Sequence, residues 1–200
     1  MSFRPGQANS FIGPLRCKTT TLVSDGREAS LLLAKVVMAS SSVGGDSSFI
    51  LDFDALYSSN ADFIFGSVPT QHANSTSIHI PDPESNVEDE LKLAFLSDAT
   101  VLIVDSLNTF RNMLSPENGA SRSRKLSFSI ASLSHFAESS KKAVILTMYR
   151  RERLGRPTEG RSMSSFSDAT ASVGVRGDTL SLKRERGVLW PGGELSIRIL

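Results

Sequence analysis

Short aliphatic runs alternate along the chain with longer segments of helical periodicity, and this alternation restricts the fold more than any other feature. Residues 100–104 (TVLIV) and 143–148 (AVILTM) lack regularly spaced polar positions, which predicts strands that are buried on both faces. Residues 19–24, 49–53 and 77–80 are expected to form three further strands. Strands that alternate with helices predict an α/β fold with a mainly parallel sheet flanked by helices.

Three helices are expected between these strands. Residues 28–39 are apolar on almost every side, which predicts a helix buried by more than one neighbour. Ser85 and Glu88 have the spacing of a capping box and precede a second amphipathic segment. The third helix carries its apolar stripe at Leu126, Ile130, Leu133 and Ala137. From residue 178 onward, short strand patterns joined by turns predict a C-terminal antiparallel β-hairpin.

The composition excludes several classes of protein. A single cysteine, Cys17, rules out a disulfide framework, and three histidines far apart in the sequence do not have the spacing of metal ligands. We therefore assign no catalytic residue and no metal site. No apolar run reaches the ~18 residues of a membrane span, and the first residues lack the apolar stretch of a signal peptide. We expect a cytoplasmic protein, or a nuclear one in a eukaryote, with an N-terminal extension (1–14) and one domain (15–200).

The charges are unevenly distributed along a chain whose net charge is +1. Residues 46–105 contain eleven acidic residues and one lysine, whereas residues 141–200 contain twelve basic and six acidic residues. The basic segment is suited to binding a polyanion. The alternative interpretation is that both segments are solvated surface.

Polar residues follow the expected strands at the points where the strands end. Asp25 follows the first strand, Asp54 follows the second, and Asp105 with Ser106 follows the run VLIV. Ligands bind beyond the carboxyl ends of the strands in open α/β sheets. An aspartate after an aliphatic strand also holds Mg²⁺ in P-loop nucleotidases. The sequence therefore predicts that a ligand site would lie at this edge of the sheet.

Residues 101–150 resemble the second half of a RecA/RadA-type recombinase core. That family has a Walker B strand ending in Asp-Ser, a Phe-Arg pair, a loop rich in Gly and Arg, a long helix and another strand. The matching residues here are Asp105, Ser106, Phe110, Arg111, Gly119, Arg122, Arg124 and Leu126. The family's second strand carries an acidic residue that polarises water, and Asp54 occupies the matching place. The final hairpin is similar to the end of RecA-like and KaiC-like domains. The resemblance extends over residues 15–200 and implies a RecA-like core that assembles with itself or with a RecA/RadA recombinase.

The chain departs from this family at the nucleotide-binding loop. The first strand should lead into G-x-x-x-x-G-K-[ST], but residues 23–30 read VSDGREAS. If Ser30 takes the Ser/Thr position, Ala29 replaces the lysine and Glu28 replaces the second glycine. Asp25 and Glu28 have the spacing of a helix cap instead. We expect a degenerate, vestigial nucleotide site with no ATP hydrolysis and no cofactor beyond weak binding of ATP and Mg²⁺.

A basic segment follows the strand at 143–148. Residues 150–161 contain five arginines and two glutamates; arginine pairs well with phosphate, and an adjacent tyrosine can stack on a base. The resemblance implies that this loop contacts single-stranded DNA, and RNA is the other nucleic-acid candidate. The alternatives are a protein interface, including one with residues 82–90 of a neighbouring copy, and a solvated loop. The candidate binding residues are Tyr149, Arg150, Arg151, Arg153, Arg156 and Arg161.

These features lead to one main hypothesis and two alternatives. The main hypothesis is a non-catalytic, core-only RecA/RadA-like paralogue that assists homologous recombination or DNA repair by binding single strands. One alternative is a structural RecA-fold subunit of a ring or hetero-oligomer, as in Elongator-like or Shu-like complexes. The other is a diverged ATPase that uses Asp54, Asp105 and a basic residue from a neighbouring subunit.

Overall fold

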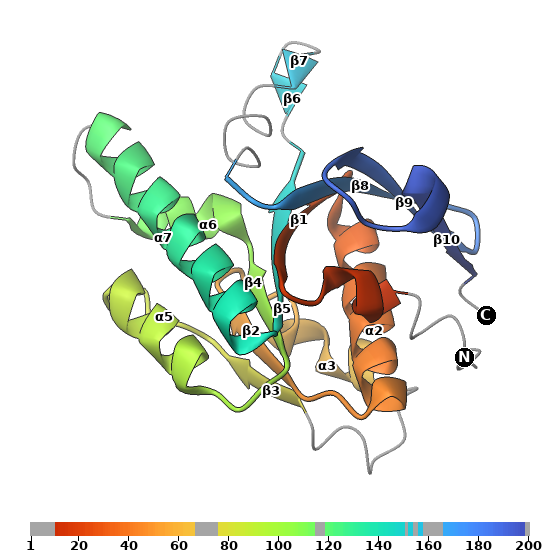
Figure 1. Cartoon of the computed structure of the whole chain (residues 1–200), viewed down its shortest axis with the longest axis horizontal. Coiled ribbons are helices and arrows are strands. Elements are labelled where there is room, and N and C mark those ends of the chain that lie inside the picture. Colours follow the sequence, from red (N-terminus) through yellow and green to blue (C-terminus); the bar gives the residue numbers. More distant parts are fainter. Residues whose placement is uncertain are drawn as a thin grey trace.

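A computed structural model describes residues 11–66, 76–114, 119–150, 152–153, 156–157 and 166–198, and the structural statements below concern these residues. Eight strands form one sheet in the order β10-β9-β8-β1-β5-β4-β2-β3 (Figure 1). Their bounds are β1 (Lys18–Ser24), β2 (Ser48–Asp52), β3 (Thr76–His79), β4 (Val101–Asp105), β5 (Ala143–Tyr149), β8 (Ala169–Arg176), β9 (Thr179–Arg186) and β10 (Glu194–Arg198).

The sheet is parallel from β8 to β3 and antiparallel at its C-terminal edge. β1 pairs in parallel with β5 and β8, and β2 pairs in parallel with β3 and β4. β9 runs antiparallel to both β8 and β10. The short strands β6 (Glu152–Arg153) and β7 (Arg156–Pro157) form a separate pair. The predicted mainly parallel α/β sheet with a C-terminal antiparallel hairpin is confirmed.

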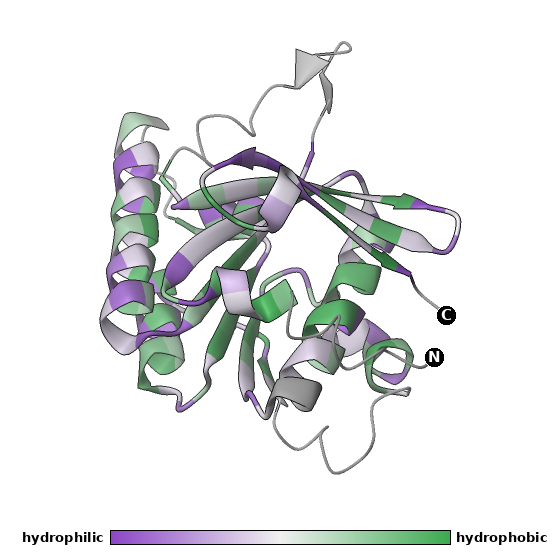
Figure 2. Cartoon of the chain, turned by 45° about the vertical axis from the view of Figure 1, so that its right-hand side comes forward, coloured by the Kyte–Doolittle hydropathy of each residue, from purple (hydrophilic) through white to green (hydrophobic). Residues whose placement is uncertain are grey.

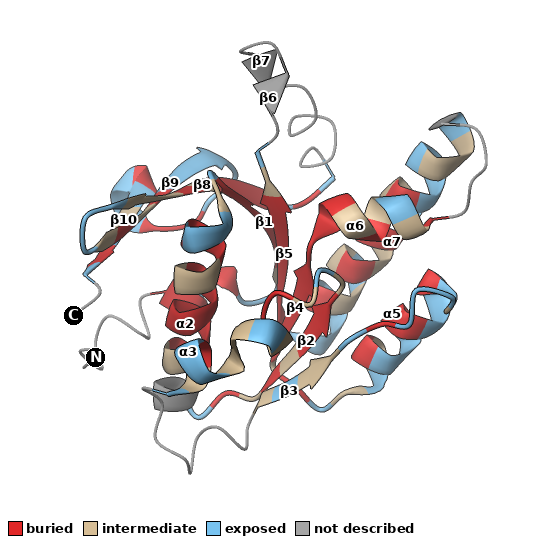
Figure 3. Ribbon diagram, turned by 180° about the vertical axis from the view of Figure 1, so that it is seen from behind, coloured by how far each residue is buried: buried red, intermediate tan, exposed pale blue. Residues whose placement is uncertain are grey.

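Helices cover the two faces of the sheet. α2 (Arg27–Gly44) and α3 (Ala61–Phe65) lie on one face, and α5 (Val87–Leu96), α6 (Leu107–Met113) and α7 (Gly119–Ser140) lie on the other (Figure 3). Short 3-10 turns occur at η1 (Gly13–Leu15), η2 (Ser58–Asn60) and η3 (Pro191–Gly193). Among the helices described, none has the length and hydropathy that crossing a membrane requires.

Strands β4 and β5 are mainly apolar because both of their faces are buried. Along β4, Val101 and Ile103 pack into the cluster under α2, whereas Leu102 and Val104 pack into the cluster under α5, α6 and α7. All five residues of β4 are buried. Figure 2, which colours each residue by hydropathy, shows apolar residues along these inner strands.

The two ends of the described chain meet in the first of these clusters. Phe11 and Ile12, which fall within the expected N-terminal extension, are buried there. The ring of Phe11 stacks on Trp190, with 6.1 Å between the ring centroids. The region just before β1 therefore packs directly against the turn between β9 and β10.

Two local predictions were wrong. The cap of α5 is Asn86, whose side chain accepts a hydrogen bond from the Glu88 amide at 3.1 Å, whereas the Ser85 hydroxyl donates to the Asp82 carbonyl. The helix α7 begins at Gly119, so Arg122 and Arg124 lie on a helix rather than in a loop. The predicted hairpin corresponds to β9 and β10, and the antiparallel pairing extends one strand further, because β8 also pairs antiparallel with β9 across the turn at Gly177, whose φ is +58°.

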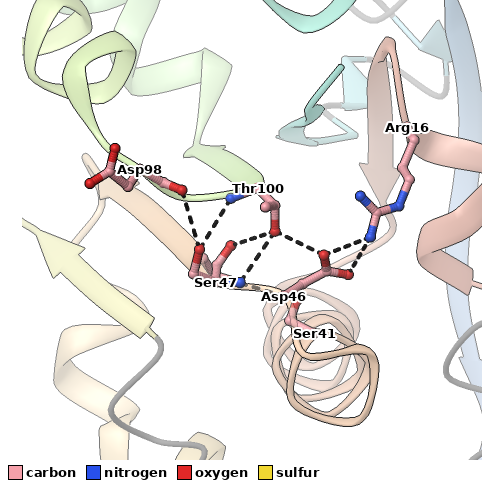
Figure 4. A network of polar contacts seen from close by, with 7 residues as sticks. Arg16, Ser41, Asp46, Ser47, Asp98 and Thr100 are labelled. Atoms are coloured by element: carbon pink, nitrogen blue, oxygen red, sulfur yellow. Dashed lines mark hydrogen bonds and ion pairs between the residues drawn. The ribbon is translucent and has the colours of Figure 1, made fainter. Parts of the chain in front are cut away.

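A polar network fixes the amino ends of the strands, opposite the candidate site (Figure 4). Arg16 donates to both carboxylate oxygens of Asp46, at 2.6 and 2.8 Å, and the Thr100 hydroxyl donates to the same carboxylate at 2.9 Å. The Ser47 amide donates back to the Thr100 hydroxyl at 3.2 Å. Asp46 is buried, and the contacts join the segments that lead into β1, β2 and β4. We assign this network a structural role.

Candidate functional site at the carboxyl ends of the strands

Four neighbouring strands, β1, β5, β4 and β2, end at the same edge of the sheet. The register aligns Ser24 with Tyr149 and Asp52 with Asp105. Strand order thus brings together segments that are distant in the sequence. These segments hold all the strand-end residues named above.

Asp105 is fully buried at the end of β4. The Thr147 hydroxyl on β5 donates a hydrogen bond to its Oδ1 atom, whereas Oδ2 has no hydrogen-bond partner among the described residues. Burial raises the pKa of Asp105 to about 7, and the nearby carboxylates of Asp54 and Asp52 add to the shift. The Thr147 and Tyr57 hydroxyls lower this pKa. The carboxyl group is therefore half protonated near neutral pH.

The two aspartates that follow β2 are engaged by local donors. Asp52 accepts the Leu56 amide at 2.9 Å and the Ser58 amide at 2.8 Å, which holds the turn after the strand. Asp54 is exposed and accepts hydrogen bonds from the hydroxyls of Ser106, at 2.7 Å, and Thr109. Within the described ranges, no three acidic, histidine or cysteine side chains are arranged to hold a metal ion.

The connection between β1 and α2 is only two residues long. β1 ends at Ser24 and α2 begins at Arg27, which leaves Asp25 and Gly26 between them. The Gly26 carbonyl accepts the Ser30 amide at 3.2 Å, as a helix-capping position does. Asp25 therefore precedes the cap, and the capping box predicted from Asp25 and Glu28 is wrong. The Asp25 amide instead donates to the Val173 carbonyl of β8 at 3.1 Å.

Two side chains of α2 that bear on the P-loop pattern, Ser30 and Lys35, make contacts within the protein. Ser30 is buried, and its hydroxyl lies 2.7 Å from the Ser24 hydroxyl. The nearest lysine, Lys35, places its ammonium group 4.5 Å from the ring centre of Phe63 on α3. Burial also lowers the pKa of Lys35.

Tyr149 is half-buried and faces the strand ends. Its amide donates to the Asn108 side chain at 2.9 Å. Burial and the Asp105 carboxylate raise the pKa of the Tyr149 hydroxyl well above its usual value, while a hydrogen bond with Ser30 lowers it. The tyrosine that the sequence suggests for stacking on a base thus has its hydroxyl near Ser30 and Asp105.

Arg150 bridges the strand-end site and the antiparallel edge. Its Nε lies 3.3 Å from Asp25 Oδ1, and one of its terminal nitrogens lies 3.2 Å from Glu185 Oε1. In the antiparallel pair of β6 and β7, the backbone of Arg153 lies opposite that of Arg156. Arg151 and Arg161, the other two arginines of the candidate surface, lie outside the described residues.

Four residues of this region were not found from the sequence. Thr147, Tyr57 and Asn108 contact or influence the strand-end residues, and Glu185 binds Arg150. Only Thr147 carried a usable signal, because it is the one polar residue in the aliphatic run AVILTM. The other three come from segments that the tertiary structure alone brings to the site.

Comparisons with known proteins identify the architecture. No family model and no curated protein matches the sequence. The structure is similar to the crystal structure of the RadB recombinase, with a TM-score of 0.68 over 100% of this chain and 96% of that chain. The two sequences are 13% identical, so the likeness concerns the fold. Together with the sheet order and the antiparallel C-terminal edge, it shows that this chain has a RecA-like α/β fold.

Proposed function

We propose that the chain is a non-catalytic relative of the RecA/RadA recombinases that assists homologous recombination or DNA repair. It binds single-stranded DNA, with RNA as the other candidate ligand, and assembles with itself or with a recombinase. The observation that carries this proposal is the two-residue connection between β1 and α2. A RecA-like fold with this connection keeps the scaffold without a phosphate-binding loop.

The chemistry of this connection argues against tight nucleotide binding. A P-loop cradles phosphates with free backbone amides and a lysine. Here the Asp25 amide is bound by β8, and Glu28 places a negative charge in the first turn of α2, where a phosphate would bind. The vestigial site formed by Asp25, Glu28, Ser30, Asp54, Asp105 and Ser106 therefore lacks the donors that ATP requires.

The basic segment after β5 supports binding to a polyanion. Residues 150–161 carry five arginines, and Arg150, the first of them, is exposed at the end of the sheet. Arginine forms bidentate hydrogen bonds with phosphate. Such contacts are independent of base sequence and weaken as salt displaces them.

Fluorescence anisotropy of a labelled single-stranded oligonucleotide tests the proposal. The protein should bind the oligonucleotide at low salt, and its affinity should decrease as the salt concentration rises. The affinity should be the same with and without ATP–Mg²⁺. Replacing Arg150, Arg151 and Arg153 by Ala should weaken binding and reduce the salt slope by roughly one unit for each phosphate that is no longer bound. Lys92→Ala is the matched control, because Lys92 is an exposed cation paired with a carboxylate on α5. No binding at low salt would overturn the proposal.

A structural subunit is the second candidate, and exposed apolar side chains favour it. Leu93 and Leu96 on α5 are 48% and 81% exposed, and Ile80, just after β3, is 53% exposed. Contiguous patches of exposed apolar surface mark protein interfaces, and Leu93 and Leu96 lie on the same helix. Light scattering should then give a mass of at least a dimer, which Leu93→Glu with Leu96→Glu should reduce. A monomer at tens of micromolar would exclude self-assembly.

A further inference from the structure

We infer that Asp25 and Glu185 act as internal competitors for Arg150, so that nucleic-acid phosphate must displace these two carboxylates to bind it. The inference rests on the proposed function and describes how the same binding surface is regulated. It assigns Asp25 a role outside the vestigial nucleotide site. It also gives a role to Glu185, a residue outside the basic segment.

The geometry places Arg150 between the two carboxylates. Asp25 faces its Nε at 3.3 Å, and Glu185 faces a terminal nitrogen at 3.2 Å. The side chains of Arg150, Asp25 and Glu185 are 36%, 58% and 44% exposed, so solvent and ligands reach all three. A phosphate group presents the same kind of oxygen acceptors to a guanidinium as these carboxylates do.

Backbone features hold Asp25 and Arg150 in place. The Asp25 amide is bound to Val173, and a Cβ on Gly174 would lie 3.2 Å from Asp25 Oδ2. A side chain at position 174 would therefore crowd the carboxylate. Arg150 is tied through its own amide to the Ser24 carbonyl at 2.9 Å.

Glu185 is presented by an irregularity in the sheet. Thr170 is opposite Arg186 and Ala171 is opposite Arg184, so Glu185 is an extra residue without a partner on β8. Such bulges redirect a side chain relative to the regular alternation of a strand. Here the bulge coincides with the residue that reaches Arg150.

The competition has a limited size because the ion pairs are exposed. Exposed pairs contribute at most about 1 kcal/mol each, which corresponds to a change in affinity of up to about five-fold. The carboxylates therefore lower the affinity for nucleic acid without abolishing it. Release of Arg150 exchanges two internal acceptors for phosphate oxygens and returns both carboxylates to water.

Anisotropy with a labelled oligothymidylate tests this competition. Asp25→Asn and Glu185→Gln keep the side-chain shapes and should each raise the affinity roughly two- to five-fold at low salt. Removing any negative charge from the protein near a bound polyanion also raises the affinity of the protein for that polyanion. Glu28→Gln is therefore the matched control, since Glu28 lies on the first turn of α2 and makes no ion pair with Arg150 in the described structure.

A double-mutant cycle separates release of Arg150 from this general effect. In an Arg150→Gln background, Asp25→Asn and Glu185→Gln should no longer raise the affinity beyond the increase caused by Glu28→Gln. An undiminished increase in that background would overturn the inference, as would equal increases for all three carboxylate variants. Thermal melting of each variant verifies that the fold is retained.

The outcomes also distinguish this inference from the proposed function. If the unmodified chain binds the oligonucleotide and Asp25→Asn and Glu185→Gln bind it no more tightly than the unmodified chain does, the competition is refuted while the proposed function stands. If the unmodified chain does not bind at low salt but a variant that combines Asp25→Asn and Glu185→Gln does, the proposed function fails while the competition is supported. If neither binds at low salt, both the inference and the proposed function fail.

Discussion

The Thr147 hydroxyl on β5 donates a hydrogen bond to the buried Asp105 carboxylate at the end of β4. This contact joins two adjacent parallel strands at the edge where ligands bind in open α/β sheets. It satisfies Oδ1, while Oδ2 has no partner among the described residues. Asp105 therefore couples the stability of the domain to pH.

The first prediction concerns pH. Burial raises the pKa of Asp105 from 3.8 to about 7, so the folded chain holds this proton more tightly than the unfolded chain. The free energy of unfolding should therefore decrease by up to about 4 kcal/mol as pH rises from about 4 to 7. Above pH 7 it should level off. Urea denaturation of the unmodified chain and Asp105→Asn between pH 5 and 8 measures this. The variant should lose that pH dependence, whereas Asp98→Asn, at an exposed site, should keep it. Equal slopes for all three proteins would contradict the prediction.

The second prediction concerns the Thr147 hydroxyl. Thr147→Val removes the hydrogen bond that lowers the pKa of Asp105, so the charged form should be destabilised further. We expect a decrease in stability of about 1–3 kcal/mol at pH 8 and a smaller decrease at pH 5, where the carboxyl group is protonated. Thr147→Ser keeps the hydroxyl and serves as the control. A decrease that is the same at both pH values would show that packing, not the charge, is responsible.

The third prediction concerns the packing of the N-terminal segment. Phe11 is fully buried against Trp190, so Phe11→Ala should lower the free energy of unfolding by about 3–5 kcal/mol. Trp190 is the only tryptophan, and its fluorescence reports the transition directly. Phe128→Ala is the control, because Phe128 is 75% exposed and its removal should change stability by less than about 0.5 kcal/mol. Similar effects of the two substitutions would argue against this packing.

The fourth prediction concerns the proposed loss of nucleotide binding and separates the length of the connection between β1 and α2 from its amino-acid composition. Replacing Glu28 by Gly and Ala29 by Lys restores two residues of the P-loop pattern. It leaves the connection between β1 and α2 at two residues. Calorimetric titration with ATP and Mg²⁺ should still show no tight binding, because the Asp25 amide remains bound to β8. Micromolar binding by this double variant would show that the missing side chains, not the short connection, disable the site.

Several parts of the structure could be predicted from short stretches of sequence. The run TVLIV predicted a strand buried on both faces, and β4 has all five residues buried. The turn VSDGREAS showed the absence of the lysine and glycines of a P-loop. These features are local, because side-chain periodicity and turn chemistry depend on neighbouring residues. The cap of α5 was harder to assign from sequence, since Ser85 and Asn86 are adjacent capping residues and the turn at Asp82 engages Ser85.

The contacts that define the site were decided by the tertiary structure. The sequence placed Asp25, Asp105 and Arg150 after strands, but strand order alone determines which of them meet. Insertion of β8 between β1 and β9 holds the Asp25 amide, and the bulge opposite β8 directs Glu185 to Arg150. Burial, which sets the pKa of Asp105, likewise exists only once the helices cover both faces of the sheet. Local sequence thus determined the secondary-structure elements, whereas long-range pairing determined the partners of each charge, because residues far apart in the chain become neighbours only in the folded sheet.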